Sequence, residues 1–279
     1  MQPSLSQTCT MPAPLEEDFH ACGDAGAEAI ELWLTKVEDY LQQHAVGELQ
    51  DLAASRNLKF AAGGVQGGLL FSQGELRKEA WKLFEQRLQL CSMLRIPTLI
   101  VVPDFVLSGA NVRVEATDIE RAQVSARQAA ELAAGFNVRL ALEFLGKAPF
   151  LNNLESAVSF AASIDHPHFG LCFDVHQFYT GPSKHEDLRY LHADNLFHVQ
   201  LSDLADVPRE LATDTDRILP GDGDFSISPV VERLREIGYG GFVSLEVWNP
   251  TFWQIAPSQV ADIGLTALRQ VLGLAQRGS

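Results

Sequence analysis

Three carboxylates lie inside short apolar segments in the second half of the chain. Glu143 lies in Leu-Ala-Leu-Glu-Phe, Asp174 in Cys-Phe-Asp-Val and Glu246 in Ser-Leu-Glu-Val. Charged groups in apolar surroundings carry a high desolvation cost, and three brought together would also repel one another. A divalent cation removes both penalties. The pattern predicts a cation site built mainly from oxygen ligands, which suits manganese, magnesium or cobalt better than a thiolate-seeking ion.

A fourth segment, Phe-His-Val-Gln-Leu, offers two further ligand candidates, His198 and Gln200. Side chains alternate along a strand, so both would point to the same side, and spacing alone leaves either as a ligand. By the same rule His176 would share the face of Asp174. His176 and Glu31 are candidates for binding a substrate, and an ordinary hydrogen-bonding role is the alternative for each.

Residues 203–225 form a long irregular segment that contains Arg209 and Arg217. Long loops in compact domains are often functional. The two arginines could hold an anionic or hydroxyl-rich substrate. Three aromatic residues could supply apolar walls for a sugar ring: Trp33, Phe71 and Trp248.

The elements that would position these residues alternate between short apolar runs and longer segments of helical period. Eight strands are predicted, at residues 5–11, 29–33, 59–65, 98–102, 139–144, 170–174, 196–201 and 241–247. Helices are predicted at residues 36–54, 75–94, 118–134, 153–164, 183–191, 229–237 and 257–274.

The strand segments are continuously apolar, as parallel strands covered on both faces are. Eight β-then-α units within about 250 residues favour a (β/α)8 TIM barrel over an open doubly wound sheet. The glycine fingerprint that would mark a dinucleotide-binding open sheet is absent from the sequence. We therefore expect a single domain over residues 1–279, with its chemistry at the carboxyl ends of the strands.

The composition narrows the class of protein further. The chain has 279 residues and a net charge of −15, which argues against binding to nucleic acid. The sequence contains neither a membrane-spanning apolar stretch nor a secretory signal pattern. The cysteines follow no CxxC spacing and are expected to be free thiols of a cytoplasmic protein: Cys9, Cys22, Cys91 and Cys172.

In their order along the chain, these segments resemble the xylose isomerase-like barrel superfamily. That group of sugar phosphate isomerases and epimerases includes D-tagatose 3-epimerase, hydroxypyruvate isomerase and inosose-processing enzymes. The resemblance covers nearly the whole chain, and its motifs include Leu-Pro-Gly-Asp-Gly at residues 219–223. It implies one divalent ion, manganese before magnesium or cobalt, bound by four residues: Glu143, Asp174, Gln200 and Glu246. It also implies that the two glutamates are the acid–base pair, and that His198 contacts substrate or a ligand residue.

The chain departs from this family at two positions. Many relatives carry a histidine at the position of Gln177, and the epimerase subgroup carries a glutamate at the position of Pro149. The typical free-ketose epimerase site is therefore incomplete here. DNA-repair endonucleases of the same superfamily need several more histidines, which with the negative charge argues against that activity.

The predicted function is a metal-dependent isomerase or epimerase of a small sugar, keto-sugar or cyclitol. Its reaction would move a proton on a carbon beside a carbonyl through an enediolate. Glu143 and Glu246 would carry the proton, and His176, His198, Arg217, Glu31 and Trp33 would bind the substrate. A dehydratase or lyase acting on a keto-cyclitol or keto-sugar, and a non-catalytic partner-dependent subunit, are the alternatives. The oligomeric state is left open, with a homo-oligomer among the options.

Overall fold

The computed structural model describes residues 1–104 and 114–275. Within these ranges eight strands form a closed parallel barrel in chain order, β1 to β8. The predicted (β/α)8 TIM barrel is confirmed. The chain divides into two compact units: a first unit of Met1–Gly63 with Val199–Ser279, and a second unit of Gly64–His198. The single domain expected from the sequence stays a prediction.

In the first unit, β1 (Gln2–Ser6) lies between β2 (Ala29–Trp33) and β8 (Phe242–Leu245). Ser6 is opposite Glu31 in the β1–β2 pair, and Leu5 is opposite Leu245 in the β1–β8 pair. Strand β7 (Leu196–Leu201) ends in this unit beside β8, with Gln200 opposite Ser244. Strand β3 (Lys59–Gln66) begins in the first unit and ends in the second.

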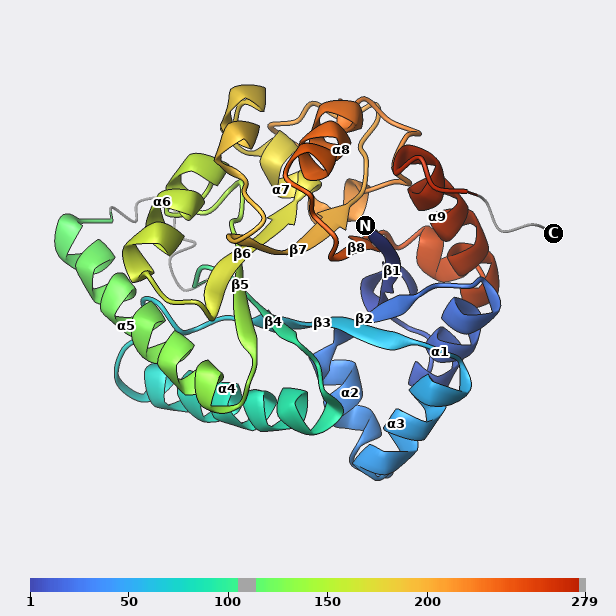
Figure 1. The fold of residues 1–279 in the computed structure, drawn as a ribbon, viewed down its shortest axis with the longest axis horizontal. Helices are drawn as coiled ribbons and strands as arrows, with labels where there is room; N and C mark the ends of the chain where they lie inside the picture. Colours follow the sequence, from blue (N-terminus) through green and yellow to red (C-terminus); the bar gives the residue numbers. More distant parts are fainter. Residues whose placement is uncertain (105–113, 276–279) are drawn as a thin grey trace. The chain divides into compact units, whose positions relative to one another are not determined.

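Helices and short 3₁₀ turns complete the first unit: α1 (Leu15–Asp24), α2 (Leu34–Tyr40), α3 (Val46–Ser55), α8 (Ile227–Glu236), α9 (Pro257–Val271), η1 (Gln7–Thr10), η4 (Asp214–Asp216) and η5 (Phe252–Gln254). Helix α9 begins with Pro257, a residue suited to the first helical position because its missing N–H would have no helical partner there. Its buried face repeats at helical spacing, with Val260, Leu265 and Leu268. This helix packs beside α1 (Figure 1).

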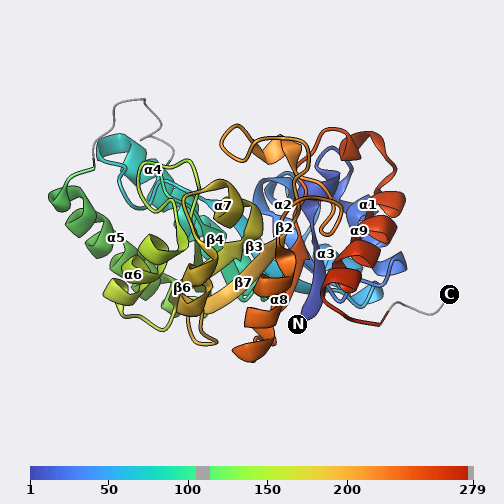
Figure 2. The same cartoon turned by 90° about the horizontal axis from the view of Figure 1, so that it is seen from above.

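The second unit contains these elements in chain order: α4 (Gly74–Leu94), β4 (Thr98–Val101), α5 (Ala116–Gly135), β5 (Arg139–Glu143), α6 (Leu154–Ile164), β6 (Phe169–Asp174), α7 (Val175–Thr180) and η3 (His185–Tyr190). Strand β5 lies between β4 and β6, and Glu143 is opposite Cys172. Helix α5 packs beside α6 (Figure 2). Every residue of β4 and β6 is buried, as expected for strands covered on both faces.

Burial of the strand side chains is the main stabilising contribution to this core. Leu140 and Leu142 in β5 and Leu171 and Phe173 in β6 are fully out of solvent. Burying one such side chain contributes about 1.5–3 kcal/mol before conformational entropy is counted. Across the described ranges 1–104 and 114–275, helices long and apolar enough to cross a membrane do not occur.

The structure corrects the predicted start of the chain. The sequence predicts the first strand at residues 5–11, but the strand ends at Ser6, and residues 7–10 form the 3₁₀ turn η1. The Ser6 hydroxyl accepts the N–H of Thr8 and so stabilises the turn. Helix α1 was missed, although its buried residues Leu15, Phe19 and Cys22 have helical spacing.

Two predicted helices also differ from those observed. The helix expected over residues 36–54 is the pair α2 and α3, because the chain becomes extended at Ala45. The helix expected over residues 183–191 is only the short 3₁₀ turn η3. Helix α7 was not predicted, because it begins directly at the end of β6 without a turn signal between them.

Candidate active site

Two buried carboxylates lie at the ends of neighbouring strands in the second unit. Glu143 ends β5 and Asp174 ends β6. A carboxylate oxygen of Glu143 lies within 4.8 Å of one of Asp174. Asp174 is completely buried and Glu143 is 6% exposed. Two like charges at this distance in an apolar core are stable only with a cation between them or a shared proton.

Asp174 is held in place by the helix that follows it. Its Oδ1 atom accepts the N–H of His176 at 2.9 Å, which makes Asp174 the N-cap of α7. His176 therefore lies in the first turn of a helix. The expectation that it shares a strand face with Asp174 was wrong, because the strand has already ended at that residue. The structure places His176 as a buried side chain in the same unit.

Gln177 is one of the two positions at which the sequence departs from the family pattern that it resembles. Its Oε1 atom accepts the N–H of Gly146 at 2.9 Å. This bond ties α7 to the segment that follows β5. Gly146 also packs closely against Gly181, where a Cβ atom would approach the backbone to 2.8 Å. The Gln177 side chain thus stabilises the backbone at Gly146. Nothing in the sequence predicted this role.

In the first unit, Glu246 directly follows β8 and pairs with Arg217. Arg217 Nη1 lies 3.2 Å from Glu246 Oε2. The guanidinium also contacts Asp214 Oδ1 at 2.8 Å and Ser202 Oγ at 3.3 Å. Arg217 is 2% exposed, so it is a buried residue although it belongs to an irregular segment. The structure brings together Arg217 and Glu246, for which separate roles are predicted from the sequence.

Cys9 holds the backbone on both sides of Glu246. Its Sγ atom donates to the Leu245 carbonyl at 3.4 Å and accepts the Val247 N–H at 3.3 Å. Burial raises the pKa of the Cys9 thiol to about 12, and the carboxylates of Glu246 and Glu31 act in the same direction. These two hydrogen bonds of the neutral thiol take the place of the backbone hydrogen bonds that a longer β1 would have made to the residues around Glu246. Sequence reasoning missed this role, because a lone cysteine carries no spacing signal.

Glu31 and Gln200 are joined by a hydrogen bond in the first unit. Gln200 Nε2 donates to Glu31 Oε1 at 2.9 Å, and the Ser6 hydroxyl donates to the same oxygen at 2.9 Å. All three side chains are buried. His198, the alternative strand ligand, is completely buried in the second unit.

The motif at residues 219–223 is a loop held by the carboxylate of Asp203. This buried group accepts N–H groups of Leu204, Gly221 and Phe225, each at 2.9 Å. A Cβ atom at Gly223 would collide with the same carboxylate. The motif therefore fixes the segment that carries Arg217. Arg209 differs, because its side chain is 42% exposed and lies 3.8 Å from Glu210.

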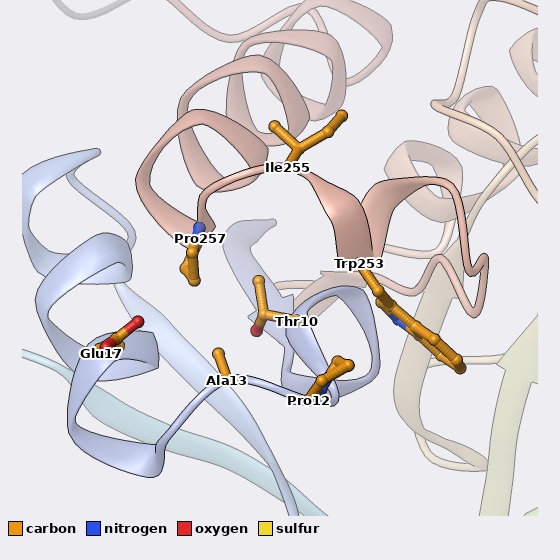
Figure 3. A pocket seen from close by; sticks show the side chains of 7 residues that line it. All are labelled: Thr10, Pro12, Ala13, Glu17, Trp253, Ile255 and Pro257. Atoms are coloured by element: carbon orange, nitrogen blue, oxygen red, sulfur yellow. The ribbon is translucent and has the colours of Figure 1, made fainter.

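The aromatic candidates belong to two separate groups. In the first unit, Trp33 contacts Trp248 edge-on with ring centres 5.1 Å apart, and Trp248 contacts Trp253 at 6.1 Å. In the second unit, Phe71 contacts Phe150 at 5.2 Å. Trp253 also borders a pocket of about 200 Å³ in the first unit (Figure 3). The other lining residues are Thr10, Pro12, Ala13, Glu17, Ile255 and Pro257.

The ligand types present in each unit fit a hard divalent cation. The second unit supplies the oxygens of Glu143 and Asp174 as a close buried pair. The first unit supplies a carboxylate at Glu246 and a buried amide at Gln200, whose Nε2 end is engaged by Glu31. Carboxylate and amide oxygens are preferred by manganese, magnesium and calcium.

Comparisons with known proteins agree with the fold. The family model described as xylose isomerase-like TIM barrel matches residues 19–271. The inosose isomerase of Halalkalibacterium halodurans is 26% identical over 250 residues, which cover 88% of this chain and 86% of that protein. The 3-dehydroshikimate dehydratase of Pseudomonas putida is 26% identical over 168 residues, which cover 59% of this chain and 26% of that protein.

A solved structure extends the comparison of the fold to nearly the full length. The crystal structure of the IolI protein with a bound zinc atom superposes with a TM-score of 0.89, at 22% identity, over 98% of each chain. At this identity the match concerns the fold alone. The family model spans most of the chain, from the middle of α1 to the end of α9. The chain belongs to the xylose isomerase-like TIM barrel family.

Proposed function

We propose that this chain is a divalent-metal-dependent isomerase or epimerase of a small sugar, keto-sugar or cyclitol. The observation that carries the proposal is the buried Glu143–Asp174 pair at the ends of adjacent strands. A pair of this kind is costly unless a cation is bound or the two carboxyl groups share a proton, and either state is typical of a functional site. The similarity to an inosose isomerase over 88% of the chain points to the same class of reaction.

The proposed ligand set is Glu143, Asp174, Gln200 and Glu246, with manganese as the first choice of ion. Barrel order supports it, because β5, β6, β7 and β8 follow one another, and parallel strands end at the same edge. When bound, the ion supplies electrostatic stabilisation to a substrate oxygen on which negative charge develops.

The two glutamates are the proposed proton carriers. One removes the proton from the carbon beside the substrate carbonyl, and the other delivers a proton to the opposite face or to the neighbouring carbon. The first route changes the configuration of a carbon, and the second moves the carbonyl. Acid–base transfer of this kind contributes about 10²–10⁴-fold to a rate. Arg217 orients Glu246 through the 3.2 Å contact between Nη1 and Oε2.

Substrate contacts are proposed for His176, His198, Arg217 and Trp33. The first three side chains are buried, and each has a polar group able to bond a hydroxyl or carbonyl oxygen. Trp33 belongs to the tryptophan group with Trp248 and offers an apolar surface to a ring.

The test is proton exchange by the manganese-loaded chain in deuterated water. The panel contains keto-cyclitols, ketohexoses and short hydroxyketones, and is read by mass spectrometry and proton NMR. We expect deuterium at the carbon beside the carbonyl in at least one compound, with an isomeric product of otherwise unchanged mass. Absence of exchange in every compound, with metal bound, would contradict the proposal.

A dehydratase is the second candidate, because the chain is also similar to a 3-dehydroshikimate dehydratase. That reaction begins with the same proton removal but then expels a β-hydroxyl as water. The same assay separates the two functions, since a dehydratase product has lost the mass of one water molecule and absorbs in the ultraviolet as a conjugated enone. Such a product, without an isomer, would favour the dehydratase.

A further inference from the structure

Glu31 and Gln200 are joined by a hydrogen bond in which Gln200 is the donor. Gln200 Nε2 donates to Glu31 Oε1 at 2.9 Å, and both side chains are buried. The same Glu31 oxygen also accepts the Ser6 hydroxyl, so it is an acceptor in both bonds. The Gln200 amide thus turns its NH₂ group toward Glu31. Its other end, Oε1, is then the atom that the side chain offers to a ligand.

Glu31 is itself held by a directed chain of hydrogen bonds from the start of the protein. Thr8 Oγ1 donates to Ser6 Oγ at 3.1 Å, and Ser6 Oγ donates to Glu31 Oε1 at 2.9 Å. Ser6 and Glu31 are opposite each other in the β1–β2 pair, so strand register brings them together. The oxygen that orients Gln200 is thus held by a donor other than Gln200, the Ser6 hydroxyl on β1.

We infer that Glu31 is a positioning residue that orients the Gln200 amide, so that Oε1 rather than the NH₂ group faces the proposed cation. This inference rests on the proposed function. An amide binds a hard cation through its oxygen, because the NH₂ group donates hydrogen bonds and offers no ligand atom. Glu31 is therefore assigned here to metal binding through Gln200, whereas the sequence had suggested substrate contact.

The primary test is the affinity of the purified, metal-free chain for Mn²⁺ alone, measured by isothermal titration calorimetry. Loss of an orienting partner of a metal ligand typically costs about 10–100-fold in affinity, and we expect this loss for Glu31→Ala. Glu31→Gln should bind Mn²⁺ much more tightly than Glu31→Ala, because its Oε1 can accept the same two hydrogen bonds. A direct substrate contact would instead raise KM and leave the Mn²⁺ affinity of both variants unchanged, which would overturn the inference.

A double-mutant cycle tests whether Glu31 acts through Gln200. Gln200→Ala should weaken Mn²⁺ binding, and adding Glu31→Ala should cause no further loss, since the side chain to be oriented is already gone. Independent, multiplicative losses would overturn the inference. Circular dichroism and thermal unfolding of the metal-free variants provide the folding control.

A swapped pair provides a test that needs no alanine variant. Gln200→Glu places a carboxylate against Glu31 and should impair Mn²⁺ binding. Adding Glu31→Gln restores a donor–acceptor pair and should recover binding; no recovery would contradict the inference. Wild-type protein that binds no Mn²⁺ would refute both this inference and the proposed function. Normal binding by wild type and Glu31→Ala alike would refute the inference alone.

Discussion

Arg217 Nη1 lies 3.2 Å from Glu246 Oε2, and little of either side chain is exposed, 3% for Arg217 and 13% for Glu246. The arginine lies in the segment that Asp203 anchors, and the glutamate follows β8 directly. Cys9 holds the peptide groups on both sides of Glu246. Glu246, one of the two proposed proton carriers, is therefore held both through its neighbouring peptide groups and through its carboxylate.

Arg217→Met should destabilise the protein strongly. Removing one partner of a buried ion pair typically costs about 3–5 kcal/mol, because the other charge stays behind without compensation. Urea unfolding of the metal-free protein measures the loss. Arg209→Met, in the same segment but exposed, is the matched control and should change stability by less than about 0.5 kcal/mol. Equal effects at the two positions would show that the Arg217–Glu246 pair is not formed in solution.

Asp18 should make the stability of the first unit depend on pH. Its carboxylate is buried beside Lys36 Nζ at 2.5 Å and accepts hydrogen bonds from Gln7 and Thr10. Burial raises the pKa of Asp18 from 3.8 to about 6, although Lys36 acts in the opposite direction. The folded protein thus binds this proton more tightly than the unfolded chain does. The resulting stabilisation is complete below the unfolded pKa and is lost as the pH rises through about 6.

The measurement is the difference in unfolding free energy between wild type and Asp18→Asn. This difference should fall by about 3 kcal/mol from about pH 3 to about pH 7, which is the shift converted at 1.36 kcal/mol per unit. Asp51→Asn, at an exposed position, is the control for removal of a charge. A difference that rises with pH, or stays constant, would show that the pKa of Asp18 is not raised in the folded protein.

The four cysteines should resist alkylation in the folded protein. All are buried, and burial raises the pKa of Cys9 to about 12. At about pH 8 only about one Cys9 thiol in ten thousand would be ionised. Iodoacetamide followed by peptide mass spectrometry should find the cysteines unmodified in native protein and fully modified in urea. Rapid native labelling of Cys9 would contradict its position between Leu245 and Val247.

Gly223→Ala should disturb the segment that carries Arg217. A Cβ atom there would collide with the Asp203 carboxylate and the Leu204 carbonyl. We expect a loss of about 1–3 kcal/mol in stability, as for other overpacked sites. Gly47→Ala is the matched control, since nothing lies within 4 Å of its added Cβ, and alanine in a helix should be neutral or slightly stabilising. A neutral Gly223→Ala would argue against the Asp203 anchor.

The sequence predicted the barrel and most strands well, because buried parallel strands produce apolar runs such as Leu140–Leu142 that local pattern alone reveals. The boundary of β1 was wrong, because the end of that strand depends on the Ser6 hydroxyl capping a turn. Strand alternation also misplaced His176, because the first turn of α7 begins immediately after Asp174.

The residues that support the site were harder to find than the candidate ligands. A carboxylate in an apolar run, such as Glu143, is conspicuous in a sequence. The partners of Glu31 and Glu246 come from distant parts of the chain, and nothing local marks them. The Gln200–Glu31 bond joins residues separated by 169 positions, and the Cys9–Val247 bond joins residues separated by 238 positions. Only the folded chain brings such pairs together.

The most direct measurement is deuterium incorporation per bound metal ion in Glu143→Gln and Glu246→Gln, with metal content and exchange determined on the same preparations. Glutamine keeps an oxygen ligand but removes the proton carrier, so metal content should fall modestly. Exchange at the substrate carbon should fall by about 10²-fold or more. If exchange per bound metal ion is retained in both variants, Glu143 and Glu246 do not carry the proton and the proposed mechanism is wrong.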